Sequence, residues 1–175
     1  SAQDLRMFEQ CHAERIQSAH GAVLDMTGSA AWRRQLSEWR NFLRHLDEQE
    51  TDPQALQAAL ERALVKARRV LAAAFENDSD RKWHKFRIAV KEVRYVADAG
   101  SAESGPGSEY ERIAAACSAV QTLLGNWHDT VVQLDLLDEL GPSAVHERLA
   151  AVIRDRKAAL LAEMHRELTD HPLFC

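Results

Sequence analysis

The sequence predicts an all-α protein built as an antiparallel bundle of six helices. Three observations support this fold class. Only 7 Gly and 4 Pro occur in 175 residues, and most of them lie between segments with helical apolar spacing. No run of alternating β-branched residues predicts a strand. With 46% hydrophobic and 28% charged residues, the chain is long enough for one buried core, so we expect a single compact domain over residues 1–175.

The first two expected helices cover residues 4–26 and about 32–46. Apolar residues recur at mostly helical spacing in the first helix, namely Leu5, Phe8, Ile16, Ala19 and Val23. Thr27-Gly28-Ser29 then supplies a stop and a new cap. The second helix has a coiled-coil-like stripe that requires a long neighbouring helix. Its members are Trp32, Leu36, Trp39, Leu43 and Leu46.

The third and fourth expected helices flank a break at residues 77–80. Thr51-Asp52-Pro53 places a capping side chain before a first-turn proline and so predicts the start of the third helix. The apolar face of this helix consists of Leu56, Leu60, Leu64, Ala67, Leu71 and Phe75. Asn77-Asp78-Ser79-Asp80 ends it and caps the fourth helix, which is expected to stop near Gly100.

The remaining sequence predicts a loop and two further helices. Residues 100–107 contain three Gly and one Pro and predict a flexible loop within the domain. A fifth helix is expected from about Ser108 to Leu140. Gly141-Pro142 then turns the chain into a sixth helix that ends before Pro172. Short connections between six helices predict antiparallel neighbours.

The fourth helix carries a row of cationic side chains. Residues 81–95 hold six Lys and Arg and one acid, Glu92, which gives +5 in a chain of formal net charge -5. At about 100° per residue, four nitrogen-bearing side chains fall within roughly 80° of arc. They are His84, Arg87, Lys91 and Arg94. The opposite side is apolar, with Phe86, Ala89, Val90, Val93, Val96 and Ala97. This pattern fits an ordinary solvated face, a neighbouring helix with carboxylates, or a bound multivalent anion.

Further cations are candidates for the same anion. Arg62, Lys66 and Arg69 follow one another at helical steps on the third helix, and Lys85 stands beside the row on the fourth. Arg148 and Lys157 on the sixth helix are better explained as solvated side chains. The tryptophans at positions 32, 39, 83 and 127 are expected to pack against other side chains rather than to stack on bases.

Two strings of sequence resemble the CHAD domain, the conserved-histidine α-helical domain. The first is His84-Lys85-Phe86-Arg87-Ile88-Ala89-Val90-Lys91-Glu92-Val93-Arg94-Tyr95, and the second is Leu124-Gly125-Asn126-Trp127-His128-Asp129. The positions that match the family pattern are His84, Arg87, Lys91, Arg94, Tyr95, Leu124, Gly125 and Asp129. The resemblance implies two four-helix repeats, each with a basic helix, that together bind inorganic polyphosphate. It also implies a place on polyphosphate granules and, in some members, fusion to a triphosphate-processing CYTH domain.

The chain departs from the family pattern because it has one basic helix where two are usual. We therefore expect residues 51–175 to be the second four-helix repeat and residues 1–50 to be the tail of the first. The leading helices of the first repeat would then be missing. We expect weaker polyphosphate binding by such a half-groove, or a second copy that covers the exposed helix faces.

The resemblance implies that the motif residues His84, Arg87, Lys91, Arg94 and Tyr95 are polyphosphate ligands. Charge and helical spacing add Lys85, Arg62, Lys66 and Arg69 as further candidate ligands, and an ordinary solvated face is the alternative for the last three. Arginine gives forked contacts to phosphate oxygens, and lysine acts as a mobile point charge. Gly125 is expected to let the basic helix come close, and Asp129 to orient Arg87 or Arg94. Alternatively, Leu124-Gly125 is a plain helix break and Asp129 a cap.

Other function classes have less support. There is no phosphate loop or nucleotide fingerprint, so we expect no enzyme, no catalytic residue and no cofactor. The 8 His lack ligand spacing and the 3 Cys are odd in number and far apart, which argues against a metal site and for a reducing cytoplasm. No membrane segment is evident, and a nucleic-acid partner is disfavoured by overall acidity. The main alternative is a helical scaffold whose basic face docks an acidic protein partner.

Overall fold

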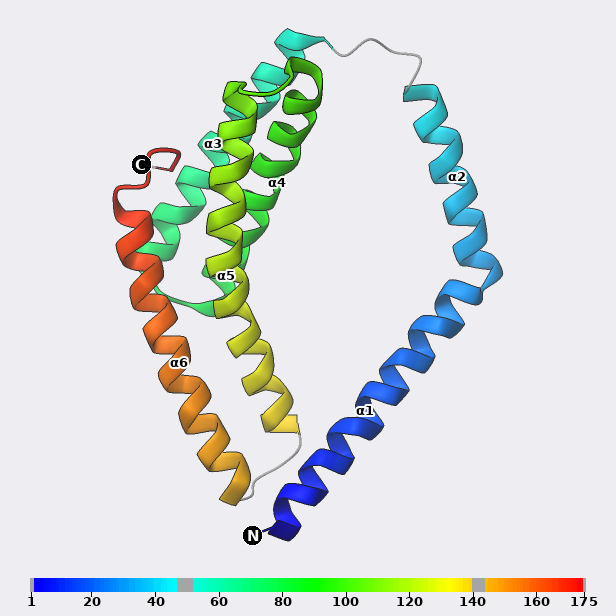
Figure 1. Ribbon diagram of the computed structural model, residues 1–175, viewed down its shortest axis with the longest axis vertical. Coiled ribbons are helices and arrows are strands. Elements are labelled where there is room, and N and C mark those ends of the chain that lie inside the picture. The colour runs from blue at the N-terminus through cyan, green and yellow to red at the C-terminus, as the bar shows by residue number, and fades with distance from the viewer. Residues whose placement is uncertain (1, 47–51, 140–143, 175) are drawn as a thin grey trace. The chain divides into compact units, whose positions relative to one another are not determined.

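The computed structural model describes residues 2–46, 52–139 and 144–174, and this part of the chain contains six helices and no strand (Figure 1). The helices are α1 (Ala2–Gly28), α2 (Ala30–Leu46), α3 (Pro53–Glu76), α4 (Asp80–Ser104), α5 (Glu109–Glu139) and α6 (Ala144–Thr169). The all-α prediction is therefore confirmed. Thr51, Leu140 and the expected turn at Gly141-Pro142 lie outside the described residues.

The chain divides into two compact units, which are described separately. One comprises Ser1–Thr51 with Leu140–Glu147, and the other comprises Asp52–Glu139 with Arg148–Cys175. The second unit contains α3, α4, α5 and most of α6. In it, α4 packs against both α3 and α5, and successive helices run in opposite directions (Figure 1).

The core of the second unit is formed around the apolar back of α4. All but Val96 of the apolar residues expected there are buried, and Trp83 joins them. The largest fully buried side chains of the unit are Trp83, Trp127, Phe86, Leu71, Leu124, Met164 and Leu168. Both tryptophans therefore serve packing, as expected. A helix held along its whole apolar side in this way presents the opposite side as a rigid surface.

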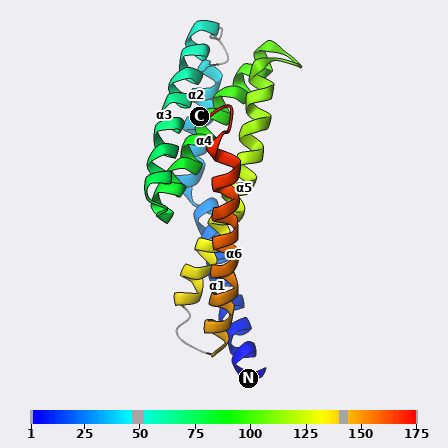
Figure 2. The ribbon, with the colours of Figure 1, turned by 90° about the vertical axis from the view of Figure 1, so that its left-hand side faces the viewer.

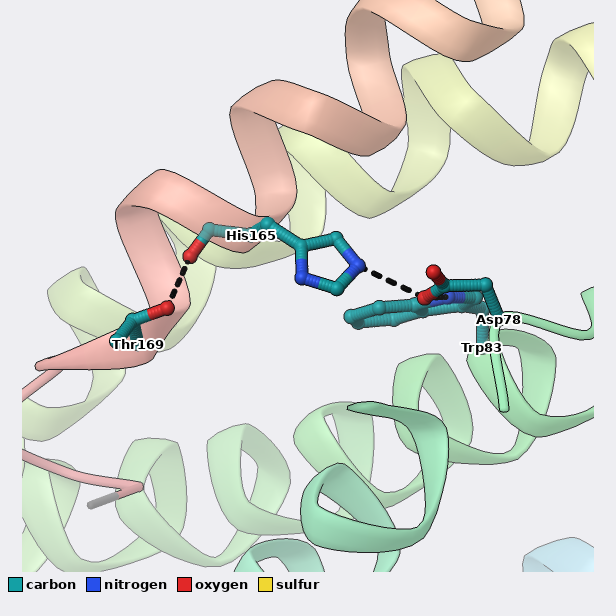
Figure 3. Close-up of polar contacts among 4 residues, drawn as sticks. All are labelled: Asp78, Trp83, His165 and Thr169. Atoms are coloured by element: carbon teal, nitrogen blue, oxygen red, sulfur yellow. Dashed lines mark hydrogen bonds and ion pairs between the residues drawn. The ribbon is translucent and has the colours of Figure 1, made fainter. Parts of the chain in front are cut away.

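The start of α4 is held to α6 by a polar cluster at Asp78. The Trp83 indole N–H donates to Asp78 Oδ1 at 3.2 Å, and His165 Nε2 of α6 lies 2.7 Å from the same oxygen. Figure 3 shows both rings meeting at this carboxylate. Lys157 Nζ of α6 lies 2.6 Å from Asp80 Oδ2 of α4. Lys157 is thus held in an ion pair between two helices and is not the freely solvated side chain that the sequence suggested.

The helix boundaries follow the expected positions with one difference, and the expected cap of α4 at Ser79 makes no side-chain hydrogen bond. Asp52 Oδ1 accepts a hydrogen bond from Gln54 N at 2.9 Å and caps α3. The difference lies at the end of α4, which continues through Gly100 to Ser104. Gly100 is fully packed because the ring of Tyr110 lies directly against it. The turn is made instead at Gly105 and Gly107, whose φ angles are 78° and 81°.

The other unit contains α1 and α2, which follow one another with a bend at Ser29 (Figure 1 and Figure 2). Ser29 Oγ accepts a hydrogen bond from Trp32 N at 3.1 Å, as the expected cap requires. None of the side chains described in these helices, at positions 6 and 9–44, is buried. Trp39 is 56% exposed. Trp39 therefore lies outside a buried core in this structure, and its ring contacts that of Phe42 at 5.4 Å between centroids.

Candidate functional site

The cationic row of α4 lies on the side opposite the core. His84, Lys85 and Tyr95 are exposed, and Arg87 and Lys91 are half-buried. Among the described residues, neither Lys85, Arg87 nor Lys91 forms an ion pair. Their charges are consequently available to an anion from solvent.

Arg94 is engaged within the protein. Its Nη1 donates to Gln121 Oε1 of α5 at 2.8 Å, and its Nε lies 3.5 Å from Asp98 Oδ2. Its guanidinium carbon also lies 5.5 Å from the centre of the Tyr95 ring. These contacts fix the guanidinium group at one end of the row, so that Arg94 has fewer free donors than the sequence alone implies.

One ion pair links the cationic side chains of α3 to α4. Lys66 Nζ lies 2.5 Å from Glu92 Oε2, which is the only acid in residues 81–95. Arg62 and Arg69 line a surface hollow of about 520 Å³ together with Lys66. Glu61 and the 63% exposed Val65 line the same hollow. The α3 side of the row is therefore partly neutralised and partly apolar.

On its other side the row meets a histidine of α5. The rings of His84 and His128 are 5.1 Å apart between centroids. Burial lowers the pKa of His128, and the positive charges of Arg87 and His84 lower it further. His128 was not predicted as a site residue. Its place four residues after Leu124, in the second matching string, is the signal that points to it.

Gly125 does not serve a close helix approach. A Cβ built at this position would meet nothing within 4 Å. Glycine in a helix interior costs about 1 kcal/mol relative to alanine, and packing does not require it here. The predicted role is therefore wrong. The alternative of a helix break at Leu124-Gly125 is wrong as well, because α5 runs unbroken from Glu109 to Glu139.

Asp129 does not orient an arginine. It is exposed, and no ion pair among the described residues joins it to Arg87 or Arg94. Arg94 takes Asp98 and Gln121 as partners instead. The physical reason is the helical register, because Asp129 lies about 100° around α5 from His128 and so off the face that meets α4. Its one visible effect is to oppose the lowering of the His128 pKa.

The buried thiol of this region is not a reactive group. Cys117 lies in the core against α4, and burial raises its pKa to about 11. The thiolate, which is the reactive form, is therefore scarce at neutral pH. Within the described part of the chain, no group of three or more His, Cys, Asp or Glu side chains is placed to hold a metal ion.

Together these features define an all-α protein with a cationic helix face between two neighbouring helices. A family model described as CHAD domain matches residues 2–138, and the chain belongs to this family. The family is associated in general with polyphosphate binding. No curated protein and no solved structure was found to match this chain. None of the helices described has the length and apolarity to cross a bilayer.

Proposed function

We propose that this chain binds inorganic polyphosphate along the basic face of α4 without turning it over. One observation carries the proposal. Lys85, Arg87 and Lys91 lie on one rigid helix and have no ion pair with any described residue. The general association of the family with polyphosphate supports the same ligand. Binding to a long polymer would also hold the chain on polyphosphate granules.

The chemistry of the face suits a linear chain of phosphates. Arg87 offers a forked pair of donors, and the two lysines add charges that follow the polymer. His84 and His128 can each donate a ring N–H to a phosphate oxygen. Each exposed contact is weak, so affinity depends on several acting together and on the release of the counterions condensed on the polymer.

The first test is a titration with polyphosphate of defined length. Orthophosphate, triphosphate and duplex DNA serve as competitors at equal phosphate concentration and at two salt concentrations. We expect the long polymer to bind best and its affinity to fall steeply with salt. Equal affinity for duplex DNA and long polyphosphate would refute the proposed ligand. Release of orthophosphate during incubation with Mg²⁺ would refute binding without turnover.

A matched pair of triple variants locates the site. Lys85, Arg87 and Lys91 are changed to Gln in the test variant, and the exposed Arg148, Arg154 and Arg156 of α6 are changed to Gln in the control. Both lose three positive charges. At about 1 kcal/mol for each exposed contact, the test variant should bind roughly a hundredfold more weakly. Equal losses in the two variants would mean that net charge, and not the α4 face, determines binding.

A second candidate function is docking of an acidic protein partner. Exposed apolar side chains on this side of α3 and α4 favour it, since polyphosphate gains nothing from them. Ile88 is 45% exposed and Val65 is 63% exposed. Changing both to Ser should leave polyphosphate binding intact but weaken a protein interface, which depends on buried apolar anchors. Affinity that does not depend on phosphate chain length would favour this second function.

A further inference from the structure

Gly125 lies at the boundary between α5 and the basic face of α4. Gln121 and His128, one turn before and one turn after it, share its side of α5. Both contact α4, Gln121 through Arg94 and His128 through the ring of His84. Helix α4 packs against both α3 and α5. By this register Gly125 lies at the edge of the α5 face that meets α4, between these two contacts, and Asp129, four residues further on, shares its side of α5.

The space in front of Gly125 is open and bordered by cations. A Cβ at Gly125 would meet nothing within 4 Å. The α4 residues at this level include Arg87 and Lys91, which lie between His84 and Arg94 on the same face. Neither has an ion pair among the described residues. Of the acids of α4 nearest to these residues, Glu92 pairs with Lys66 on the α3 side, and Asp98 lies at the far end beside Arg94.

The α3 side of the same face is less suited to an anion. Two carboxylates, Glu61 and Glu92, lie there, and Glu92 already neutralises Lys66. On the α5 side, Gln121 and His128 carry an amide and an imidazole, which can both donate. Asp129, one turn after Gly125, is the one carboxylate of residues 121–129 on this side, and it lies about 100° around α5 from His128.

Gly125 destabilises its helix relative to alanine, and no neighbouring atom requires a glycine at this position. Its presence therefore needs another physical explanation. We propose that the space in front of Gly125 is a subsite for one phosphate group of the polymer, so that the chain of phosphates follows the boundary between α4 and α5 rather than that between α3 and α4. The proposal rests on the polyphosphate function proposed above. Arg87 and Lys91 hold the phosphate from α4, while His128 donates from α5. Any side chain at position 125 occupies the space that the phosphate oxygens need.

Substitution of the glycine separates binding from folding. Gly125→Ala removes the flexibility of glycine from a helix, so its melting temperature should rise by about 2 °C. The same variant should bind long polyphosphate several-fold more weakly, and Gly125→Leu at least tenfold more weakly. Asn126→Leu is the control, because it introduces a leucine side chain at the adjacent exposed position of α5. It should bind as the wild type does.

The outcomes distinguish the subsite from the function on which it rests. If the wild type does not bind polyphosphate, the proposed function fails. If the wild type binds and the Lys85, Arg87 and Lys91 variant does not, the function stands. In that case, wild-type affinity of both Gly125 variants overturns the subsite. A double change of Arg62 and Arg69 to Gln that weakens binding more than Gly125→Leu would place the polymer on the α3 side, and so also overturn it.

Discussion

Gly100 is the position where one added methyl group tests the packing of α4 against α5. A Cβ at Gly100 would lie 2.3 Å from Cδ1, 2.5 Å from Cγ and 2.6 Å from Cε1 of Tyr110. Real Cβ atoms do not approach other atoms this closely, so the ring has to move. Tyr110 Oη also donates to Gln57 Oε1 of α3 at 3.2 Å. Gly100→Ala therefore disturbs contacts among three helices.

The expected size of this effect follows from three contributions. Overpacking costs about 1 to 3 kcal/mol, and loss of the tyrosine hydrogen bond costs about 1 kcal/mol. Alanine gains about 1 kcal/mol over glycine in a helix. The sum is a loss of about 1 to 3 kcal/mol, which lowers the melting temperature by roughly 2 to 10 °C in a protein of this size.

Urea and thermal unfolding, followed by circular dichroism, measure this loss. A double-mutant cycle with Tyr110→Ala supplies the control, since the methyl group then has space. In that background Gly100→Ala should become neutral or stabilising. A neutral or stabilising effect in the wild-type background would show that the ring does not pack on Gly100 and would refute the reasoning.

Three further predictions concern stability and reactivity. Burial lowers the pKa of His128 and His171 in the folded state, so below pH 6.5 the unfolded state binds more protons. Unfolding free energies should be highest above pH 6.5 and fall as the pH falls below it, and His→Asn changes at both positions should flatten this dependence. Asp78→Ala leaves the buried indole of α4 without its acceptor and should cost about 1 to 3 kcal/mol in urea unfolding, whereas no loss would contradict the cluster in Figure 3. Iodoacetamide at pH 8 should label the exposed Cys11 rapidly and Cys117 only after unfolding, and peptide mass spectrometry would reveal early labelling of Cys117 as a contrary result.

The sequence was sufficient for features that depend on local periodicity. The apolar back of α4 and the capping role of Asp52 were predicted because each is decided within one or two helical turns. The contacts of Arg94 with Gln121 and of Lys66 with Glu92 were not, since they depend on the register between helices. The Arg94–Asp98 pair is local, because its members lie four residues apart on one helix.

The two helical glycines of the second unit show this limit most clearly. Sequence reasoning assigned close approach to Gly125 and a loop to Gly100. The structure places a tyrosine ring against Gly100 and open space at Gly125. A glycine inside a helix has the same local signature in both situations. Only the position of the neighbouring helix decides whether its missing side chain makes room for protein or leaves room for a ligand.

The ion pairs around the row also change what affinity can be expected. Residues 81–95 carry a formal charge of +5; Lys66 neutralises their one acid, Glu92, from outside the window, whereas Asp98 neutralises Arg94. The three proposed ligands without an ion pair among the described residues, Lys85, Arg87 and Lys91, span about 9 Å along the helix axis. Such a face holds only a short piece of polymer, and a longer polymer mainly offers more registers in which to bind. Affinity per polymer molecule should therefore grow in proportion to chain length. A steeper increase would mean that further cations, on α3 or on a second copy of the chain, hold the same polymer.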